Sequence, residues 1–282
     1  MKLIKPTFEI LPQSKGLDGI YKQIEIAGRH CYKSEDKITE TSAKEFVDRM
    51  IKSNHVAMLE HGTTYLKVNT EDINKGDCEI DLFTDNNPYS RLIIQSDYWY
   101  ITTNLRVLLE HNLLGLLKYI YEPTEFHEKR TTVKFIMDRI GSQSFVRHRV
   151  FSFAQESTRY CNYSKDKFDN EITIIAPNWL DFGLLKILNP FDILDQTDHS
   201  TAEEVYLHAM AQAEQDYFKL LAKGWTPQQA RAVLPNSLKT ELVMTGFDSD
   251  WEHFFELRTP ATAHPQAREL AIPLQKEMNK IK

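Results

Sequence analysis

One polar stretch near the middle of the chain limits what its surroundings can fold into. It runs from Arg147 to Tyr160 with the sequence RHRVFSFAQESTRY. The run lacks the apolar period of 3.6 residues that a packed helix needs, and it is too polar for a core strand. Arginine donates hydrogen bonds through a planar fork that fits phosphate and the edges of planar heterocycles. The stretch is therefore either a solvated, salt-bridged loop or a site for an anionic ligand.

The order of the polar residues in this stretch is informative. Arg147, His148 and Arg149 are followed after seven residues by Ser157, and Arg159-Tyr160 closes the run. This pattern resembles the RHR-x7-S signature of the flavin-dependent thymidylate synthases. The resemblance extends over residues 27–34, 58–68, 141–168 and 226–270.

The resemblance implies a fold and an activity. The fold would be a mixed α/β (α+β) domain with a central antiparallel sheet flanked by helices, the thymidylate synthase-complementing protein fold, assembled as a homotetramer with shared active sites. The activity would be the reductive methylation of dUMP to dTMP without an enzyme nucleophile. FAD would be the redox carrier, NADPH the reductant and methylenetetrahydrofolate the carbon donor.

The resemblance also assigns roles to individual residues. Arg258 would be the catalytic residue, because the family's arginine lies against the pyrimidine and favours ionisation at N3. The residues expected to contact FAD are Cys31, His61, Thr63, Arg147, His148, Arg149, Gln155, Phe247, His253 and His264. Those expected to bind dUMP are Ser144, Arg147, Gln155, Glu156, Ser157, Thr158, Arg159, Arg231 and Arg258. No metal is implied. The chain departs from many relatives at Ser144, where Gln is common, and from some at Phe247 and His253, where they carry Asn.

Composition limits the other function classes. The net charge of −6 argues against a protein that binds nucleic acid polymers, which normally carries a basic face. Three widely spaced cysteines, without metal-type pairing, fit a reducing cytoplasm. The N-terminus has no apolar signal segment, and no window approaches 18 uncharged apolar residues, so we expect no membrane span.

Several alternative functions remain open. A thymidylate synthase with a cysteine nucleophile is one, although no Pro-Cys-His context surrounds any cysteine. A non-enzymatic nucleotide- or RNA-binding module is another. The main alternative is a dUMP- or nucleotide-binding flavin oxidoreductase without methyl transfer.

The remaining patterns predict a single domain over residues 1–282, with insertions at about 74–130 and 178–200. Strands are expected at 2–11, within 58–68, and at 89–94, 98–102, 131–138 and 171–176. Helices are expected at 17–30, 42–53, 104–121, 201–223 and 226–234, around 251–258, and at the C-terminus. Capping boxes are predicted at Ser42 with Glu45 and at Thr201 with Glu204. Residues 238–246 are expected to form a short element, and 74–77 and 84–88 to form turns.

Overall fold

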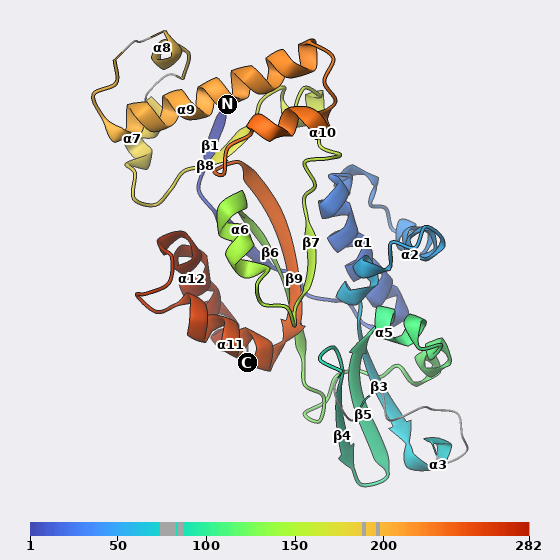
Figure 1. Ribbon diagram of the computed structural model, residues 1–282. Coiled ribbons are helices and arrows are strands. Elements are labelled where there is room, and N and C mark those ends of the chain that lie inside the picture. The colour runs from blue at the N-terminus through green and yellow to red at the C-terminus, as the bar shows by residue number, and fades with distance from the viewer. Residues whose placement is uncertain (74–82, 84–86, 188–189, 196–197, 282) are drawn as a thin grey trace.

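A central antiparallel sheet organises the molecule (Figure 1). The computed structural model describes residues 1–73, 83, 87–187, 190–195 and 198–281. The sheet has the strand order β2-β6-β9-β7. Its strands are β2 (Thr7–Ile10), β6 (Arg130–Asp138), β9 (Lys239–Phe247) and β7 (Ser152–Gln155). The predicted mixed fold with a central antiparallel sheet is therefore confirmed.

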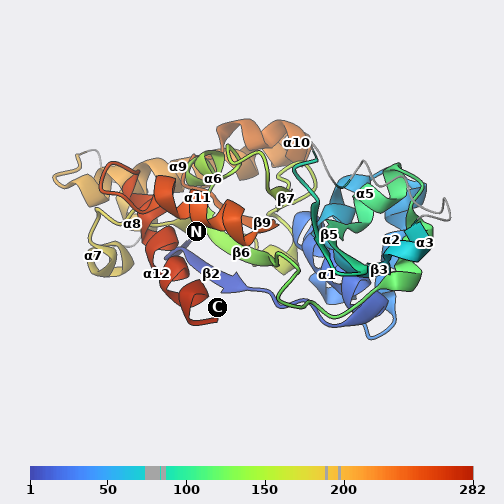
Figure 2. The same ribbon diagram turned by 90° about the horizontal axis from the view of Figure 1, so that it is seen from below.

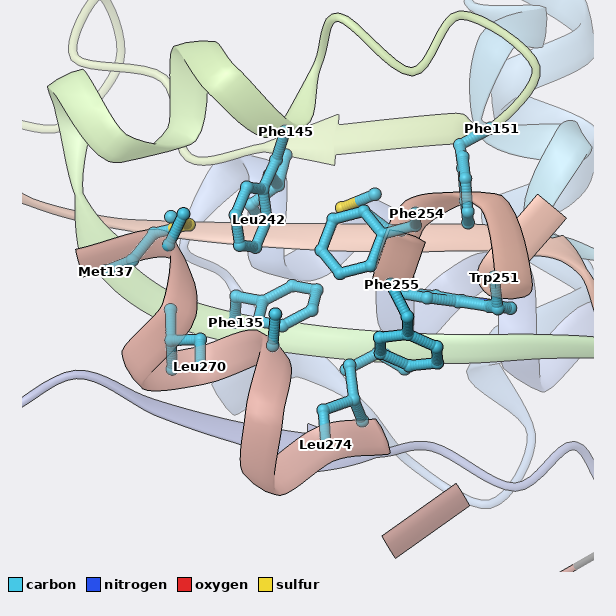
Figure 3. Packing of buried hydrophobic residues seen from close by; sticks show 14 of the residues in the cluster. Phe135, Met137, Phe145, Phe151, Leu242, Trp251, Phe254, Phe255, Leu270 and Leu274 are labelled. Atoms are coloured by element: carbon cyan, nitrogen blue, oxygen red, sulfur yellow. The ribbon is translucent and has the colours of Figure 1, made fainter. Parts of the chain in front are cut away.

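Helices cover both faces of this sheet. On one face lie α6 (Arg139–Phe145), α11 (Asp248–Arg258) and α12 (Pro265–Ile281), and Figure 3 shows the core that they form with β6 and β9. On the other face lies α1 (Gly16–Tyr32), where Val243 packs with Ala27 and Ala154. Leu242 and Met244 belong to the first core, so successive residues of β9 serve opposite faces. Because β9 is buried on both sides, it lacks the alternation that marks a half-buried strand, and the sequence predicted only a short element there.

Two further groups of elements lie at opposite ends of the central sheet (Figure 2). At one end, β3 (Thr63–Asn69), β5 (Tyr98–Asn104) and β4 (Arg91–Gln95) form an antiparallel sheet. The helical elements there are α2 (Ser42–Lys52), α3 (Thr70–Asp72), α5 (Leu105–Glu110), η1 (Glu35–Lys37), η2 (Val56–His61) and η4 (Leu114–Tyr119). Because β5 pairs with β3 along its whole length, the first expected insertion is integrated with the residues that precede it.

At the other end, α9 (Ala202–Ala222) packs over a parallel strand pair, β1 (Lys2–Ile4) and β8 (Thr173–Ile175). The second expected insertion contributes α7 (Phe182–Ile187) and α8 (Pro190–Leu194), which pack against α9. The connecting elements are η5 (Asp166–Phe168), α10 (Pro227–Ala230) and η6 (Arg231–Val233). Within the described ranges, no helix is long and apolar enough to cross a membrane.

Most expected elements are present, and some of them are divided in the structure. The expected strand 2–11 is divided at Lys5-Pro6, so that β1 pairs with β8 and β2 with β6. The expected helix 104–121 is split into α5 and the 3-10 turn η4. The turn expected at 74–77 lies outside the described residues, as does most of that at 84–88.

The two predicted capping boxes have different outcomes. Thr201 Oγ1 accepts the Glu204 N–H at 3.2 Å and Glu204 Oε2 accepts the Thr201 N–H at 3.1 Å, so that prediction is confirmed. The prediction for Ser42 is wrong, because this residue already lies inside α2. Its hydroxyl donates to Glu25 Oε2 at 2.8 Å. The buried Glu25 carboxylate therefore takes the hydroxyl that would have capped the helix.

Candidate active site

The polar signature stretch contains a strand that the sequence did not predict. Residues 152–155 form β7 and pair antiparallel with β9, with Gln155 opposite Leu242. The strand tolerates its polar side chains because it lies at the sheet edge and they find partners. Gln155 Nε2 donates to Ser142 Oγ at 2.8 Å and to Thr240 Oγ1 at 3.3 Å. The run was expected to be too polar for a core strand, and the strand that these four residues form lies at the edge of the sheet.

The first half of the signature contacts the end of α11. Arg258 Nε donates to His148 Nε2 at 2.9 Å, and Arg258 Nη2 donates to the Ser144 carbonyl at 2.6 Å. The His148 ring is buried against Phe254, with 5.0 Å between ring centroids. Burial and the neighbouring guanidinium lower the pKa of His148 to about 4. His148 is therefore a neutral acceptor at physiological pH, and it fixes the orientation of Arg258.

The charge of Arg258 is not neutralised by its partners. In the part of the chain that the structure describes, both of its hydrogen-bond acceptors are uncharged groups. Burial lowers the pKa of Arg258, and the nearby Arg147 lowers it further. Arg147 and Arg149 are exposed. Two guanidinium groups close together without a carboxylate form an electrostatic site for an anion.

The second half of the signature contacts the α10–η6 segment. Arg231 Nη1 donates to Thr158 Oγ1 at 3.2 Å, and Arg159 Nε donates to Gln228 Oε1 at 3.1 Å. Both arginines are exposed. The Ser157 hydroxyl oxygen lies beside them and accepts the Arg159 N–H at 3.4 Å. The structure thus brings together the two arginines expected to bind phosphate, and their role in binding it stays a prediction.

A basic cavity of about 600 Å³ opens next to this second half. Tyr160 of the signature lies on its wall, with its ring 5.9 Å from that of Tyr32. The cationic side chains that line it are Arg29, Lys33, Lys37, Arg49 and Lys167. Sequence reasoning did not select Tyr32, Arg49 or Tyr160 as site residues. Only Tyr160 could have been found from the sequence, because it belongs to the signature. Tyr32 and Arg49 gave no such signal, because only the folded chain brings the ends of α1 and α2 to this place.

Three residues expected to touch a flavin are interior residues. His61 is 0% exposed, Thr63 3% and Phe247 1%. His61 Nδ1 lies 2.8 Å from Thr245 Oγ1, and burial together with Arg130 lowers the pKa of His61 to about 3. Thr63 Oγ1 accepts a hydrogen bond from Arg130 Nη1 at 3.4 Å. In a single chain these side chains offer a ligand almost no surface, so their flavin contact stays a prediction.

The other expected site residues divide into exposed and inward-facing groups. His253 is exposed with its ring 6.2 Å from that of His148, and His264 is exposed with its ring 5.8 Å from that of Trp179. Glu156 instead faces inward and is 2% exposed. Its Oε2 accepts a hydrogen bond from Lys239 Nζ at 2.8 Å. Glu156 was expected to bind substrate, but its carboxylate is directed away from the exposed signature residues.

The two cysteines in the described ranges are poor nucleophiles. Cys161 is 1% exposed, and burial raises its pKa to about 12, with a further contribution from Glu156. Burial likewise raises the pKa of Cys31 to about 11. Both thiols are therefore protonated at neutral pH. Cys78 lies outside the described residues.

One group of residues has the composition of a metal site. His30, Glu35 and Glu241 place three ligand atoms within 4.8 Å of one another. However, Lys33 Nζ lies 2.8 Å from Glu35 Oε1 and 2.6 Å from Glu241 Oε1. An ammonium group already neutralises these carboxylates, so the cluster is better described as an ion-pair network.

Comparisons with known proteins agree with the position of the signature. The profile of the family described as thymidylate synthase complementing protein matches residues 115–282. A flavin-dependent thymidylate synthase of Sulfurisphaera tokodaii is 29% identical over 145 residues, which cover 51% of this chain and 48% of that protein. One of Mycobacterium avium is 29% identical over 164 residues, 56% of this chain and 62% of that protein. The matched part thus spans about half to three fifths of these relatives.

A solved structure also aligns with the chain, at low similarity. The UMP/dUMP methylase PolB from Streptomyces cacaoi, bound with 5-Br UMP, is 16% identical to the chain, with a TM-score of 0.44. The alignment covers 99% of this chain and 92% of that one.

Proposed function

Because the chain belongs to the thymidylate synthase complementing protein family, we propose that it converts dUMP to dTMP by reductive methylation. Methylenetetrahydrofolate donates the carbon, NADPH supplies the reducing equivalents and FAD carries them. The observation that carries this proposal is the Arg258 guanidinium. It is held in place by uncharged acceptors, so its positive charge is available to a pyrimidine that becomes anionic.

The residues around the first half of the signature fit a flavin dinucleotide in part. Arg147 and Arg149 are exposed, and a dinucleotide pyrophosphate is a suitable partner for their guanidinium groups. His253 lies at the same place, with its ring near that of His148. When bound, FAD supplies the hydride that reduces the transferred carbon. Phe247 packs in the interior and would support this site rather than bind the cofactor.

The second half of the signature fits the nucleotide phosphate. Arg159 and Arg231 are two exposed cations on adjoining segments, and Ser157 adds a hydroxyl group. Phosphate accepts several charge-assisted hydrogen bonds from such donors. Gln155 already bonds Ser142 and Thr240, so it holds the edge of the site in place. We assign Arg159, Arg231 and Ser157 to dUMP binding.

Arg258 acts on the pyrimidine ring. A guanidinium at a ring carbonyl stabilises negative charge that develops on the ring, and this interaction strengthens in the transition state. His148 accepts from Arg258 Nε and leaves the other N–H groups of the fork to the substrate and Ser144. No enzyme thiolate is required, and the protonated state of Cys31 and Cys161 supports this.

The two halves of the site lie at opposite ends of β7. Arg258 is tied to His148 before this strand, and Arg231 is tied to Thr158 after it. In Figure 1, α11 and α10 lie toward opposite ends of β7. Four strand residues span roughly 13 Å, and in a mononucleotide one ribose separates the base from the phosphate. We therefore propose that one dUMP is bound by Arg231 of one chain and Arg258 of another, in a homotetramer with shared sites.

The two free cysteines of the described ranges, Cys31 and Cys161, support a reducing compartment. The proposal therefore includes a cytoplasmic location, where folate and NADPH serve as co-substrates.

Product analysis tests the proposed function. The purified protein is incubated with FAD, NADPH, methylenetetrahydrofolate and dUMP, and dTMP is separated by chromatography. We expect dTMP only when all four are present. Arg231→Ala should weaken dUMP binding roughly ten- to a hundredfold, since it removes a charged hydrogen bond worth about 1.5–3 kcal/mol.

The matched control is Arg106→Ala, which removes an arginine that pairs with Glu60 and Glu110. It should leave dUMP binding unchanged. Oxidation of NADPH that depends on dUMP but yields no dTMP would contradict methyl transfer and identify a flavin oxidoreductase instead.

A further inference from the structure

A network of ion pairs lies beneath the second half of the signature. We call it the signature network and define it as Glu156, Lys239, Glu241, Lys33, His30 and Glu35. Lys239 Nζ lies 2.8 Å from Glu156 Oε2 and 2.7 Å from Glu241 Oε1. Lys33 Nζ lies 2.6 Å from the same Glu241 oxygen. Ion pairs therefore connect three segments that are distant in sequence: the end of α1, the start of β9 and the signature.

His30 closes the network on the α1 side. Its Nδ1 lies 3.0 Å from Glu241 Oε2 and 2.9 Å from Glu35 Oε1. Burial opposes protonation of His30, but the two carboxylates outweigh it and raise its pKa. Burial also opposes ionisation of Glu35, but hydrogen bonds from His30 and Lys33 lower its pKa to about 2. Charges of opposite sign thus alternate through the network.

The Glu156 carboxylate is the member that belongs to the signature. Its side chain is 1% exposed, and Oε1 has no hydrogen-bond partner among the described residues. Lys239 is therefore its single bonded partner in the described ranges. Lys33 acts on Glu156 only from a greater distance, without a hydrogen bond. A buried carboxylate that loses its one hydrogen-bonded counter-ion is strongly destabilised unless it moves into water.

Glu156 controls where its neighbours lie. Exposure alternates along the run, so that Glu156 and Thr158 face inward while Gln155 and Ser157 are half-exposed. The backbone is clamped at the same place, because the Glu156 N–H donates to the Glu241 carbonyl at 2.8 Å and the Ser157 N–H donates to the Cys31 carbonyl at 3.2 Å. If the Glu156 side chain turned outward, the inward and outward directions of its neighbours' side chains would change. Ser157 would then move from its present position.

We propose that Lys239 is a positioning residue of the dUMP site, which holds Glu156 inside the protein and thereby sets the position of Ser157 and Arg159. This inference rests on the proposed function. Lys239 does not itself touch the substrate. Its action is indirect, through a carboxylate that cannot stay ionised and buried without it.

The proposal predicts that removing the Lys239 ammonium group weakens dUMP binding, and that removing the Glu156 charge as well restores it. In Lys239→Met the Glu156 carboxylate loses its hydrogen-bonded counter-ion and turns outward, whereas the wild type keeps Glu156 paired. The titratable and charged groups around Glu156 are Lys239, Lys33, Cys31, Cys161 and Tyr163, and Glu241 lies on the other side of Lys239.

Calorimetric titration of the FAD-loaded protein with dUMP at neutral pH measures this effect directly. Lys239→Met should weaken dUMP binding about tenfold or more. Glu156→Gln keeps an acceptor for Lys239 and should lose little dUMP affinity. The double variant Glu156→Gln/Lys239→Met leaves no unpaired carboxylate at this place, so it should bind dUMP better than Lys239→Met.

Lys134→Met is the matched control. Lys134 lies on the neighbouring strand β6 and pairs with Glu9 at 2.6 Å, where Glu9 is 58% exposed. This variant should keep wild-type affinity for dUMP. If Lys239→Met does not fold, Lys239→Gln is measured instead, with the same expected order.

The outcomes separate the two proposals. A wild-type protein that binds no dUMP overturns the proposed function and this inference with it. If the wild type binds dUMP and Lys239→Met binds it equally well, the inference alone falls, even when the variant unfolds at a lower temperature. It also falls if the double variant is as weak as Lys239→Met, because the effect would then not pass through Glu156.

Discussion

At the scale of single residues, Arg258 shows how a site can be prepared without a bound substrate. A guanidinium has five N–H donors, and among the described residues only His148 and the Ser144 carbonyl accept from it. We predict that Arg258→Ala lowers the rate of dUMP-dependent flavin reoxidation by about 10²–10³-fold, with a smaller loss of dUMP affinity. The reason is that its charge matters most when the ring becomes anionic. Stopped-flow oxidation of the reduced enzyme at saturating dUMP measures the rate.

Two controls sharpen this prediction. Arg258→Lys should recover little, because an ammonium group cannot donate to both partners and still present a planar fork. Since the pKa of His148 is lowered to about 4, the imidazole accepts from Arg258 above that pH and loses this role only below it. The ratio of wild-type to variant rates should thus stay constant through neutral pH. An unchanged rate in Arg258→Ala would remove the residue from catalysis.

Individual residues also show what the sequence could and could not reveal about the site. Arg159 and Arg231 were selected from their motifs, and the structure brings them to adjoining segments. Lys239 and Glu241 carried no motif. Their importance depends on the register in which β9 pairs with β7, which places Glu241 beside Glu156. Such pairings cannot be read from one segment alone, since strand register is set by the whole sheet.

At the scale of elements, close packing of α1 on α2 shapes the basic cavity. A Cβ atom at Gly28 would meet the Phe46 ring of α2, which lies on the cavity wall beneath Arg29 and Arg49. We predict that Gly28→Ala lowers the free energy of unfolding by about 1–3 kcal/mol through overpacking. Urea denaturation measures this. Gly115→Ala is the control, because nothing lies within 4 Å of its added Cβ, and equal losses in both variants would contradict the packing argument.

Elements differed in how well the sequence predicted them. The long helices α1 and α9 were predicted because an apolar face repeats along them, and Thr201 supplied a cap for α9. The strand β9 was underestimated, although it lies in the middle of the sheet. Its Thr240, Glu241 and Thr245 are polar yet buried, because each bonds a partner from another element. A local hydrophobic pattern cannot anticipate partners that tertiary structure supplies.

At the scale of the whole molecule, the arrangement of the two arginine groups decides how many chains make one site. Arg258 contacts His148 before β7 and Arg231 contacts Thr158 after it, and four strand residues span roughly 13 Å, so we propose that one mononucleotide meets these arginines on different chains. The proposed site between chains would account for two half-sites whose arginines have no acidic hydrogen-bond partner among the described residues. Subunits in closed homo-oligomers present such half-sites to one another through symmetry.

Mixed oligomers test this arrangement. At dUMP concentrations well below the dissociation constants of the variants, Arg231→Ala and Arg258→Ala should each have little activity alone, because each lacks one half of every site. Co-expressed in equal amounts, they form sites that combine an intact Arg231 from one chain with an intact Arg258 from another. Random assembly gives about a quarter of the sites this combination, so about a quarter of wild-type activity should return. Two affinity tags verify that both chains are present. Verified mixed oligomers without recovered activity would show that both arginines act within one chain, and α11 would then have to move toward α10 when dUMP binds.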